Sequence, residues 1–345
     1  PEFGTLEDLR ALVDGAHSRN IAVMIDWVAN HTSYDHEWTK NKSWYQLDSA
    51  GNIVHPPGTN WRDVAQLNFN NQEMKDAMID AMSYWVYNAN IDGFRCDYAD
   101  FVPNNFWSDA ISKLRKIKKN QNILMLAEGS KVNHFASGFD YTFGFNFFST
   151  LEQVFKDGKS ATTIQDSNTT EYANNYHTEN RIVRYTSNHD VNLSEGTPLE
   201  LFGGKKGSIA TFVVASYLKS VPMIYNGQEI GYDKRLNYFA KTPIDWSTAD
   251  ASMLAEYKKI IAFRNTSNAI KTGEFNGYSS DAVSAFTMTK NAEKVFVLSN
   301  LTSSTVKHLV PSTLKGNWKD AFTGTAVTVG SEITLQPFQY LVLKN

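Results

Sequence analysis

Helix-period segments alternate with apolar runs of strand length along most of the chain. Residues 5–18 place apolar side chains on one helical face, and Thr5 with Asp8 three residues later forms the pattern of a capping box. The next run, "IAVMIDWV" (21–28), is apolar apart from Asp26, which is typical of a strand buried on both faces. Residues 71–90 return to helical spacing, with methionines along one stripe. These elements predict a strand between two helices.

The same alternation continues to about residue 264. Strands that alternate with helices in this way predict an α/β domain with a parallel sheet. Further strands are expected at 91–97, 122–129, 139–147, 181–188 and 221–229, and further helices at 104–119, 148–158, 207–219 and 250–264. With the first apolar run, this makes six expected strands.

Two segments depart from this alternation. Residues 29–70 lack regular periodicity and are rich in Asn, Gly, Trp and His, which favours a small excursion with a functional role. From residue 268 onward, short β-rich pieces alternate with turns and show no helical spacing, which is typical of an antiparallel β-sandwich. We therefore expect an α/β domain over 1–267 and a β-sandwich domain over 268–345.

Composition narrows the functional classes. Of the 345 residues, 42% are hydrophobic and 20% are charged, which suits a large core and not a disordered chain. The net charge is −3 and no basic stripe stands out, so nucleic acid is not expected as a partner. No apolar run reaches the ~18 residues of a membrane-spanning helix, so a membrane is not expected either. A single cysteine, Cys96, excludes an internal disulfide.

Polar and ionisable side chains gather where the expected strands end. In a parallel barrel these ends share one face, where the loops after the strands build the active site. Each group alone has a simpler explanation, because such a carboxylate often caps the next helix, and the arginine could form a purely structural ion pair. Together they favour a site, since buried charge is costly and four strands contribute to the group. The residues are Asp26, Asn30, His31, Arg95, Asp97, Glu128, Asn188, His189 and Asp190.

Several carboxylates without a metal-binding or phosphate-binding motif suit glycoside hydrolysis. A retaining enzyme needs an ionised carboxylate as nucleophile and a protonated carboxyl as acid/base. Arg95 lies two residues before Asp97 on the same expected strand and favours the ionised form of that carboxylate. Glu128 ends the apolar run "ILMLAE", and apolar surroundings favour the protonated form of a carboxyl.

Four motifs at strand ends give the chain a family likeness. "DWVANH", "GFRCD", "MLAEG" and "YTSNHD" occur in the same order in the α-amylase family of retaining glycoside hydrolases (family 13), which the chain resembles over most of its length. The resemblance implies a (β/α)8 TIM barrel, with a small domain B at 29–70 and a C-terminal antiparallel β-sandwich. It also implies hydrolysis of α-glucosidic bonds, mainly α-1,4, in starch or maltodextrins.

The resemblance assigns the catalytic roles to three of the matching residues. Asp97 would be the nucleophile that forms a glycosyl-enzyme in a double displacement. Glu128 would be the acid/base, and Asp190 would hold sugar hydroxyls and stabilise the transition state.

The resemblance assigns His31, Arg95 and His189 to the substrate-binding part of the site. The two histidines would bind hydroxyls of the sugar on the cleaved side, and Arg95 would position Asp97. Asp26 would be a buried partner of Arg95 and not a catalyst.

Three features depart from the family pattern. Asp100 and Phe101 stand where α-amylases often carry Lys-His for the leaving-side sugars, and we expect Asp100 to serve the N-terminus of the following helix. Gln66, in the weaker motif "AQLNFNN", stands where an acidic or basic residue is usual. Six expected strands after the start at "PEFGT" imply an N-terminally incomplete barrel, completed by a missing segment or by another chain. The isolated chain is then expected to be weakly active or inactive.

Several alternatives stay open. An α-glucosidase or glucosyltransferase could use the same residues, and a non-catalytic amylase-like sugar-binding module is the alternative outside the enzymes. No cofactor is required. Calcium is common in the family, but Asn30 supplies only one oxygen, so no metal is assigned. Trp44, Tyr45 and Trp61 either stack on sugar rings or form a small core. An α-glucan substrate favours an extracellular or periplasmic location, with the cytoplasm as the alternative.

Overall fold

The computed structural model describes residues 3–118, 123–173 and 181–345. The last residue of the expected helix at 104–119 and the first of the expected strand at 122–129 therefore lie outside the described residues. The chain forms two compact units, Pro1–Phe143 and Gly144–Asn345. Among the described residues, no helix combines the length and the apolar character that a membrane span requires.

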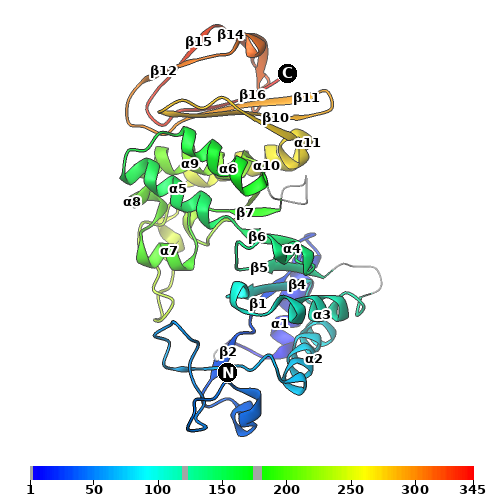
Figure 1. Ribbon diagram of the computed structural model, residues 1–345. Coiled ribbons are helices and arrows are strands. Elements are labelled where there is room, and N and C mark those ends of the chain that lie inside the picture. The colour runs from blue at the N-terminus through cyan, green and yellow to red at the C-terminus, as the bar shows by residue number, and fades with distance from the viewer. Residues whose placement is uncertain (1–2, 119–122, 174–180) are drawn as a thin grey trace. The chain divides into compact units, whose positions relative to one another are not determined.

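The first unit consists of a parallel sheet and the helices packed against it (Figure 1). Its strands follow one another in the order β1 (Met24–Val28), β4 (Gly93–Asp97), β5 (Leu124–Ala127) and β6 (Tyr141–Phe143). Its helices are α1 (Leu6–His17), α2 (Gln72–Ala89), α3 (Asn104–Leu114) and α4 (Asn133–Ala136). The chain thus alternates strand and helix, as the hydrophobic pattern predicts.

Caps and apolar stripes explain where the first helices form. Thr5 and Asp8 form the expected capping box at the start of α1. Asn71 caps α2, because its side-chain oxygen accepts a hydrogen bond from the N–H of Met74 at 3.0 Å. The stripe of α2 packs into one core with α3 and the sheet, and this core includes Met74, Met78, Met82, Phe94, Phe106, Trp107 and Met125.

β1 is less buried than its apolar run predicts. Its pattern is mixed, and the flanking Ile21 and the terminal Val28 are 56% and 44% exposed. The cause is its place at the edge of the sheet, where β4 is its described neighbour. The prediction of a strand buried on both faces is therefore wrong for β1.

The segment 29–70 contains little regular structure, as its lack of periodicity predicts. Tyr45 and Leu67 are nevertheless buried and belong to the core of the first unit. Its assignment as a separate domain B stays a prediction. The regular elements are β2 (His31–Ser33), β3 (Val64–Gln66) and the 3-10 helices η1 (Glu37–Lys40) and η2 (Lys42–Trp44).

The second unit begins with helices and a short pair of parallel strands. The strands are β7 (Ile182–Arg184) and β8 (Val221–Pro222). The helices are α5 (Phe145–Lys156), α6 (Thr162–Ala173), α7 (His189–Ser194), α8 (Pro198–Leu201), α9 (Gly204–Tyr217), α10 (Ala251–Thr266) and α11 (Asn268–Thr272). Two 3-10 helices follow β8, namely η4 (Gln228–Ile230) and η5 (Trp246–Thr248).

Some expected boundaries in this region are wrong. The strand predicted at 139–147 ends at Phe143, and α5 begins two residues later. The strand predicted at 221–229 consists of two residues, because Pro222 lacks the N–H that a longer ladder needs. α6 was not expected, since its sequence is polar and Ile164 is its one buried apolar residue.

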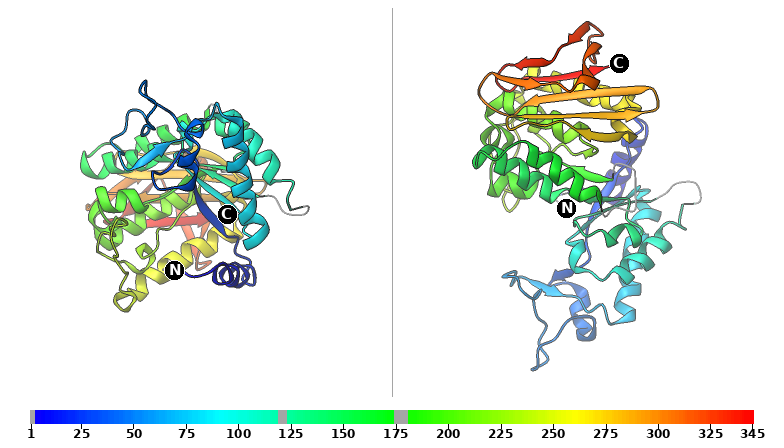
Figure 2. Two further views of the ribbon diagram at one scale, coloured as in Figure 1. Left: turned by 90° about the horizontal axis from the view of Figure 1, so that it is seen from below. Right: turned by 45° about the horizontal axis from the view of Figure 1, so that its top comes forward.

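The C-terminal strands form the predicted antiparallel β-sandwich (Figure 2). The main sheet has the order β14 (Ala326–Val329), β13 (Gly316–Asp320), β16 (Tyr340–Lys344), β11 (Glu293–Asn300), β10 (Val283–Lys290) and β9 (Glu274–Gly277). A second sheet pairs β12 (Val306–Leu309) with β15 (Glu332–Leu335), and η6 (Ser312–Leu314) follows β12.

β10 and β11 are buried on both faces. One face of the main sheet packs with Val310 and Leu335 in the core of the sandwich. The other lies on helices, as the hydrogen bond from Ser299 on β11 to the carbonyl oxygen of Ala210 on α9 shows, at 2.9 Å. In Figure 2 the orange and red strands form a layer over the green and yellow helices.

Candidate active site

One guanidinium links the carboxylates at the ends of three strands in the first unit. Nη1 of Arg95 donates to both carboxylate oxygens of Asp26, at 2.9 and 3.0 Å, and to Oδ1 of Asp97 at 2.8 Å. Its Nη2 donates to Glu128 at the end of β5. The parallel register explains the convergence, because Asp26 lies opposite Arg95 and Glu128 follows the residue opposite Cys96.

These groups differ in burial. The side chains of Arg95, Asp97 and Glu128 are 14%, 25% and 18% exposed, whereas that of Asp26 is 60% exposed. Burial disfavours the charged guanidinium, but Glu128, Asp26 and Asp97 outweigh this effect and raise the pKa of Arg95. The expected pairing of Asp26 with Arg95 is confirmed. The expectation that Asp26 is buried is wrong, because β1 lies at the sheet edge.

The carboxyl group of Glu128 lies in a polar setting. Besides Arg95, its Oε2 accepts a hydrogen bond from the backbone N–H of Tyr98 at 2.8 Å. The expectation of apolar surroundings is therefore wrong. The buried members of the preceding run, Met125 and Ala127, pack into the core, whereas Glu128 follows the end of the strand, where the loops gather.

Tyr98 turns the chain sharply after Asp97. Its φ of 49° lies in the left-handed region, which is uncommon for a bulky residue. The N–H of the next residue, Ala99, donates to the carbonyl oxygen of Glu128 at 3.0 Å, and the N–H of Glu128 donates to the carbonyl oxygen of Cys96 at 2.9 Å. The turn therefore holds both the main chain and the side chain of Glu128. Because backbone groups do this, no sequence signal singles out Tyr98.

His31 is oriented by a pair of amide side chains. Nδ2 of Asn30 donates to Oε1 of Gln66 at 3.2 Å, and Nε2 of Gln66 donates to Oδ1 of Asn30 at 3.3 Å. Nδ2 of Asn30 also lies 3.3 Å from Nδ1 of His31. Burial lowers the pKa of His31 by more than the charges of Asp97 and Asp63 raise it. Its imidazole is therefore neutral near pH 7.

The same amide pair decides whether calcium fits at Asn30. Calcium in proteins takes about six to eight oxygen ligands. The side chain of Asn30 is 1% exposed, and its oxygen accepts the hydrogen bond from Gln66. The side-chain oxygen of Asn30 is therefore already engaged by Gln66, and no step below uses a calcium ion.

A row of aromatic rings leads outward from His31. The ring centroid of Trp61 lies 5.7 Å from that of His31 and 4.9 Å from that of Tyr98. Tyr98 stacks on Phe101 with the centroids 4.0 Å apart. Trp61 and Phe101 are 37% and 61% exposed, so this row presents ring surface to solvent on both sides of Tyr98.

The other two candidates for sugar stacking serve the core. Tyr45 is 1% exposed, and its hydroxyl lies 2.8 Å from Oγ1 of Thr32. Trp44 is partly buried against the same core and packs edge to face on Trp38, with centroids 5.1 Å apart. Of the three candidates, Trp61 is the one that keeps an exposed ring.

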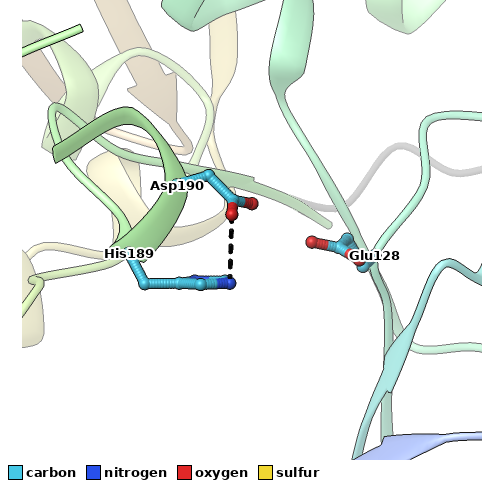
Figure 3. A group of neighbouring side chains, drawn as sticks. All are labelled: Glu128, His189 and Asp190. Atoms are coloured by element: carbon cyan, nitrogen blue, oxygen red, sulfur yellow. Dashed lines mark ion pairs between the residues drawn. The ribbon is translucent and has the colours of Figure 1, made fainter. Parts of the chain in front are cut away.

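His189 and Asp190 open helix α7 in the second unit (Figure 3). Asn188 caps this helix, because its Oδ1 accepts a hydrogen bond from the N–H of Val191 at 2.9 Å. Nε2 of His189 lies 3.5 Å from Oδ1 of Asp190, and the side chains are 39% and 52% exposed. The hydroxyl of Tyr238 donates to Oδ1 of Asp190 at 3.1 Å.

A cavity of about 460 Å³ lies beside Tyr238 in the second unit. Tyr225 and Trp246 are among the residues that line it. Burial and the charge of Asp190 raise the pKa of both tyrosines, so their hydroxyls stay protonated and can donate. The sequence prediction missed Tyr238, although the density of aromatic residues over 232–246 is a signal that could have found it.

Asp100 does not cap the helix that follows it. α3 begins after Pro103 and has no side-chain cap. Asp100 lies in the 3-10 turn η3 (Ala99–Phe101), and its Oδ1 is 2.6 Å from Nε2 of His134. The expectation is wrong because this turn directs the carboxylate toward the loop after Glu128, away from the start of α3.

Cys96 lies between Arg95 and Asp97 and faces the core. Side chains alternate across a strand, so Arg95 and Asp97 share the face that carries the carboxylates, and Phe94 and Cys96 share the other. The thiol is completely buried, and burial together with the charge of Asp26 raises its pKa well above the usual value.

The structure thus joins Arg95, Asp97 and Glu128 in the first unit. In the second unit, His189 and Asp190 lie together on α7. The roles that the resemblance assigns to these residues stay predictions.

Comparison with known proteins supports the family assignment that the sequence motifs indicate. The family model described as "Alpha amylase, catalytic domain" matches residues 1–52 and 58–249. Alpha-amylase 2 of Dictyoglomus thermophilum is 27% identical, over 95% of this chain and 60% of the relative. Neopullulanase 2 of Thermoactinomyces vulgaris is 26% identical, over 100% of this chain and 63% of the relative. The chain therefore spans less than two thirds of the length of these relatives.

Solved structures show the same fold. A maltogenic α-amylase from Thermotoga neapolitana matches with a TM-score of 0.85 and 22% identity, over 99% of this chain and 81% of that one. An α-amylase from Lactobacillus plantarum matches with a TM-score of 0.84 and 23% identity, over 99% of this chain and 82% of that one. The predicted fold, an incomplete TIM barrel with a C-terminal β-sandwich, is confirmed.

Proposed function

Because this chain belongs to the α-amylase family of glycoside hydrolases, we propose that it serves to cleave α-glucosidic bonds in α-glucans. The finer proposal is retaining hydrolysis, mainly of α-1,4 bonds in starch or maltodextrins. One observation carries it: a single guanidinium, that of Arg95, binds the carboxylates of both Asp97 and Glu128 at the ends of neighbouring strands. Two carboxyl groups held side by side are what a retaining glycosidase uses.

In the first step, a carboxylate oxygen of Asp97 attacks the anomeric carbon of the sugar. The bond from that carbon to the glycosidic oxygen breaks, and Glu128 gives its proton to this oxygen. The products are a glycosyl ester on Asp97 and a free leaving sugar. Arg95 and the N–H of Tyr98 stabilise the carboxylate that Glu128 becomes after it has given up the proton.

In the second step, Glu128 takes a proton from a water molecule as that water attacks the anomeric carbon. The ester bond to Asp97 breaks, and the sugar leaves with its configuration retained. The neutral imidazole of His31 suits a hydrogen bond to a sugar hydroxyl, and we propose the same role for His189. Asp190 holds further hydroxyls and favours the positive charge that develops on the sugar ring.

The aromatic row and the cavity supply the apolar contacts that sugar rings need. The exposed ring of Trp61 offers a stacking surface beside Tyr98, the residue that follows Asp97. In the second unit, the cavity lined by Tyr225, Tyr238 and Trp246 combines ring surface with hydroxyl donors, which suits a glucosyl unit.

The experiment compares three carboxylate substitutions in the same protein. Asp97→Asn should abolish hydrolysis of maltooligosaccharides, and Glu128→Gln should lower kcat by ~10²–10⁴-fold. Asp26→Asn is the matched control, because Asp26 binds the same guanidinium but is 60% exposed and has no proposed role in bond cleavage. Turnover that survives Asp97→Asn would refute the mechanism.

Product analysis distinguishes a hydrolase from a glucosyltransferase and from a sugar-binding module. Chromatography of the products should show glucose and short maltooligosaccharides as the main species. Longer products, made by transfer to a second sugar, would indicate a glucosyltransferase with the same residues. Binding of maltooligosaccharides by calorimetry without any turnover would indicate a sugar-binding module.

A further inference from the structure

We propose that the pair formed by Asp100 and His134 positions Glu128 for proton transfer. The proposal rests on the proposed function, because it takes Glu128 to be the acid/base. Neither residue touches the reacting atoms, so both are positioning residues. They act through the short loop that follows Glu128.

The pair joins the two segments that follow the active strands. Asp100 lies in the turn after β4, three residues beyond Asp97. His134 lies in α4, which follows β5 and Glu128. The carboxylate Oδ1 of Asp100 is 2.6 Å from Nε2 of His134, and the side chains are 19% and 1% exposed. A short, nearly buried contact therefore ties the turn after the nucleophile to the helix after the acid/base.

Gly129 places the main chain directly against this pair. A Cβ atom at Gly129 would lie 2.4 Å from Oδ1 of Asp100 and 2.7 Å from Nε2 of His134, so a side chain there would displace these atoms. The peptide that follows Glu128 is thus packed on the hydrogen bond itself. A shift of either Asp100 or His134 must shift this peptide as well.

Further contacts fix the loop on the same carboxylate. Oxygens of Asp100 lie 3.4 Å from the N–H nitrogens of Ser130 and Lys131. The ammonium of Lys131 donates to the carbonyl oxygen of Asp100 at 2.6 Å. The loop after Glu128 therefore wraps around Asp100.

The protonation states of Asp100 and His134 favour a single orientation of the imidazole. Burial raises the pKa of Asp100, but the hydrogen bond and charge of His134 and the loop N–H groups outweigh this and lower it overall. An ionised carboxylate only accepts hydrogen bonds, so Nε2 of His134 carries the proton. Nδ1 of His134 is buried and has no hydrogen-bond partner among the described residues. The imidazole is thus held in one orientation by Asp100 and by packing.

The consequence for the reaction follows from the geometry of proton transfer. Glu128 must reach the leaving oxygen within hydrogen-bond distance, and a misplacement of about 1 Å can cost ~10²-fold in rate. Loss of the pair frees the loop from Gly129 onward, while the hydrogen bonds that the N–H and the carbonyl oxygen of Glu128 make with Cys96 and Ala99 remain. The expected defect is therefore in protonation of the leaving group, with the attack by Asp97 spared.

The experiment varies how much proton donation the substrate needs. Cleavage of a maltooligosaccharide expels a sugar, which is a poor leaving group and needs the proton of Glu128. Fluoride, the leaving group of α-maltosyl fluoride, departs with little help from an acid. His134→Leu should lower kcat/KM for the oligosaccharide by ~10–100-fold and for the fluoride by less than ~3-fold. His134→Gln, which can place an N–H near the position of Nε2, should restore part of the loss. Asp100→Asn keeps the shape of the side chain and should show a milder form of the same pattern.

His308→Gln is the matched control. His308 is a buried histidine whose ring has one hydrogen-bond contact among the described residues, to Ser280 in the second unit at 3.1 Å, so it tests for a general loss of stability. It should affect both substrates equally. If His134→Leu and Asp100→Asn also affect both substrates equally, while Glu128→Gln selectively loses the oligosaccharide, the positioning role is wrong and the proposed function stands. If Glu128→Gln itself shows no preference, Glu128 is not the acid/base and both proposals are wrong.

Discussion

Replacement of Arg95 by methionine is the most direct test of the electrostatics of the site. The change keeps the length and apolar stem of the side chain and removes the guanidinium. It leaves Asp97 and Glu128, 25% and 18% exposed, beside each other without their cation. Asp26 is 60% exposed and is solvated by water instead.

The magnitude follows from this burial. Removal of one partner from a fully buried ion pair costs ~3–5 kcal/mol, whereas an exposed pair contributes ~0–1 kcal/mol. The two inner carboxylates are mostly but not fully buried, so the free energy of unfolding should fall by about 2–4 kcal/mol near pH 7. Arg95→Lys retains the charge but cannot donate to three carboxylates at once, and its loss should be intermediate.

Urea denaturation followed by tryptophan fluorescence measures this loss. Arg62→Met is the matched control, because Arg62 is exposed and has no ion pair among the described residues, and it should change stability by less than ~0.5 kcal/mol. The raised pKa of Arg95 keeps it charged across the range, so the pH dependence comes from the carboxylates. Protonation of a carboxylate removes the repulsion, so the deficit of Arg95→Met should shrink as the pH falls into the acid range.

The reasoning would be refuted by two results. The first is an Arg95→Met variant whose loss of stability stays within ~0.5 kcal/mol of that of Arg62→Met. The second is a deficit that grows as the pH falls, because repulsion between carboxylates can only weaken under that change.

Three further predictions follow from single contacts. The lowered pKa of Asp100 means that its bond to His134 stabilises the folded state above pH ~4 and loses this effect as the pH falls further. The loss of stability caused by Asp100→Asn should therefore be largest near pH 7 and vanish in acid, and a loss that stays constant across urea titrations at different pH values would contradict this. Tyr238→Phe removes the 3.1 Å hydrogen bond to Asp190 and should lower kcat/KM for maltooligosaccharides by ~2–10-fold, with unchanged kinetics as the contrary result. Gly93→Ala would place a Cβ atom 2.0 Å from a carbonyl oxygen of β5 and should lower the free energy of unfolding by at least ~1–3 kcal/mol, so unchanged urea unfolding would contradict the close approach of these strands.

The sequence predicted the fold class well because its signals are local and repeated. The capping box of Thr5 and Asp8 and the methionine stripe of 71–90 were each sufficient to place a helix. The failures have physical causes. α6 has no apolar stripe, and β1 is apolar but lies at a sheet edge, so hydrophobic periodicity could find neither the helix nor the exposure of the strand.

The sequence predicted the parts of the candidate site that side chains form, but not those that backbone groups form. Strand ends and family motifs indicated Arg95, Asp97 and Glu128, and the structure joins these three. The polar setting of Glu128 was missed, because it depends on the backbone N–H of Tyr98, which any residue would supply. The partner of Asp100 was missed because His134 lies 34 positions further along the chain.

The position of Cys96 allows thiol labelling to report on the opening of this site. The single thiol of the chain is buried in the core, and Cys96 lies between two candidate site residues, Arg95 and Asp97. Its raised pKa leaves the thiol almost wholly in the unreactive protonated form. A thiol reagent can label it only when β4 separates from its neighbours. The labelling rate of the native protein therefore reports how often the strand that carries Arg95 and Asp97 opens. A bound oligosaccharide that holds this strand in place would be detected as slower labelling.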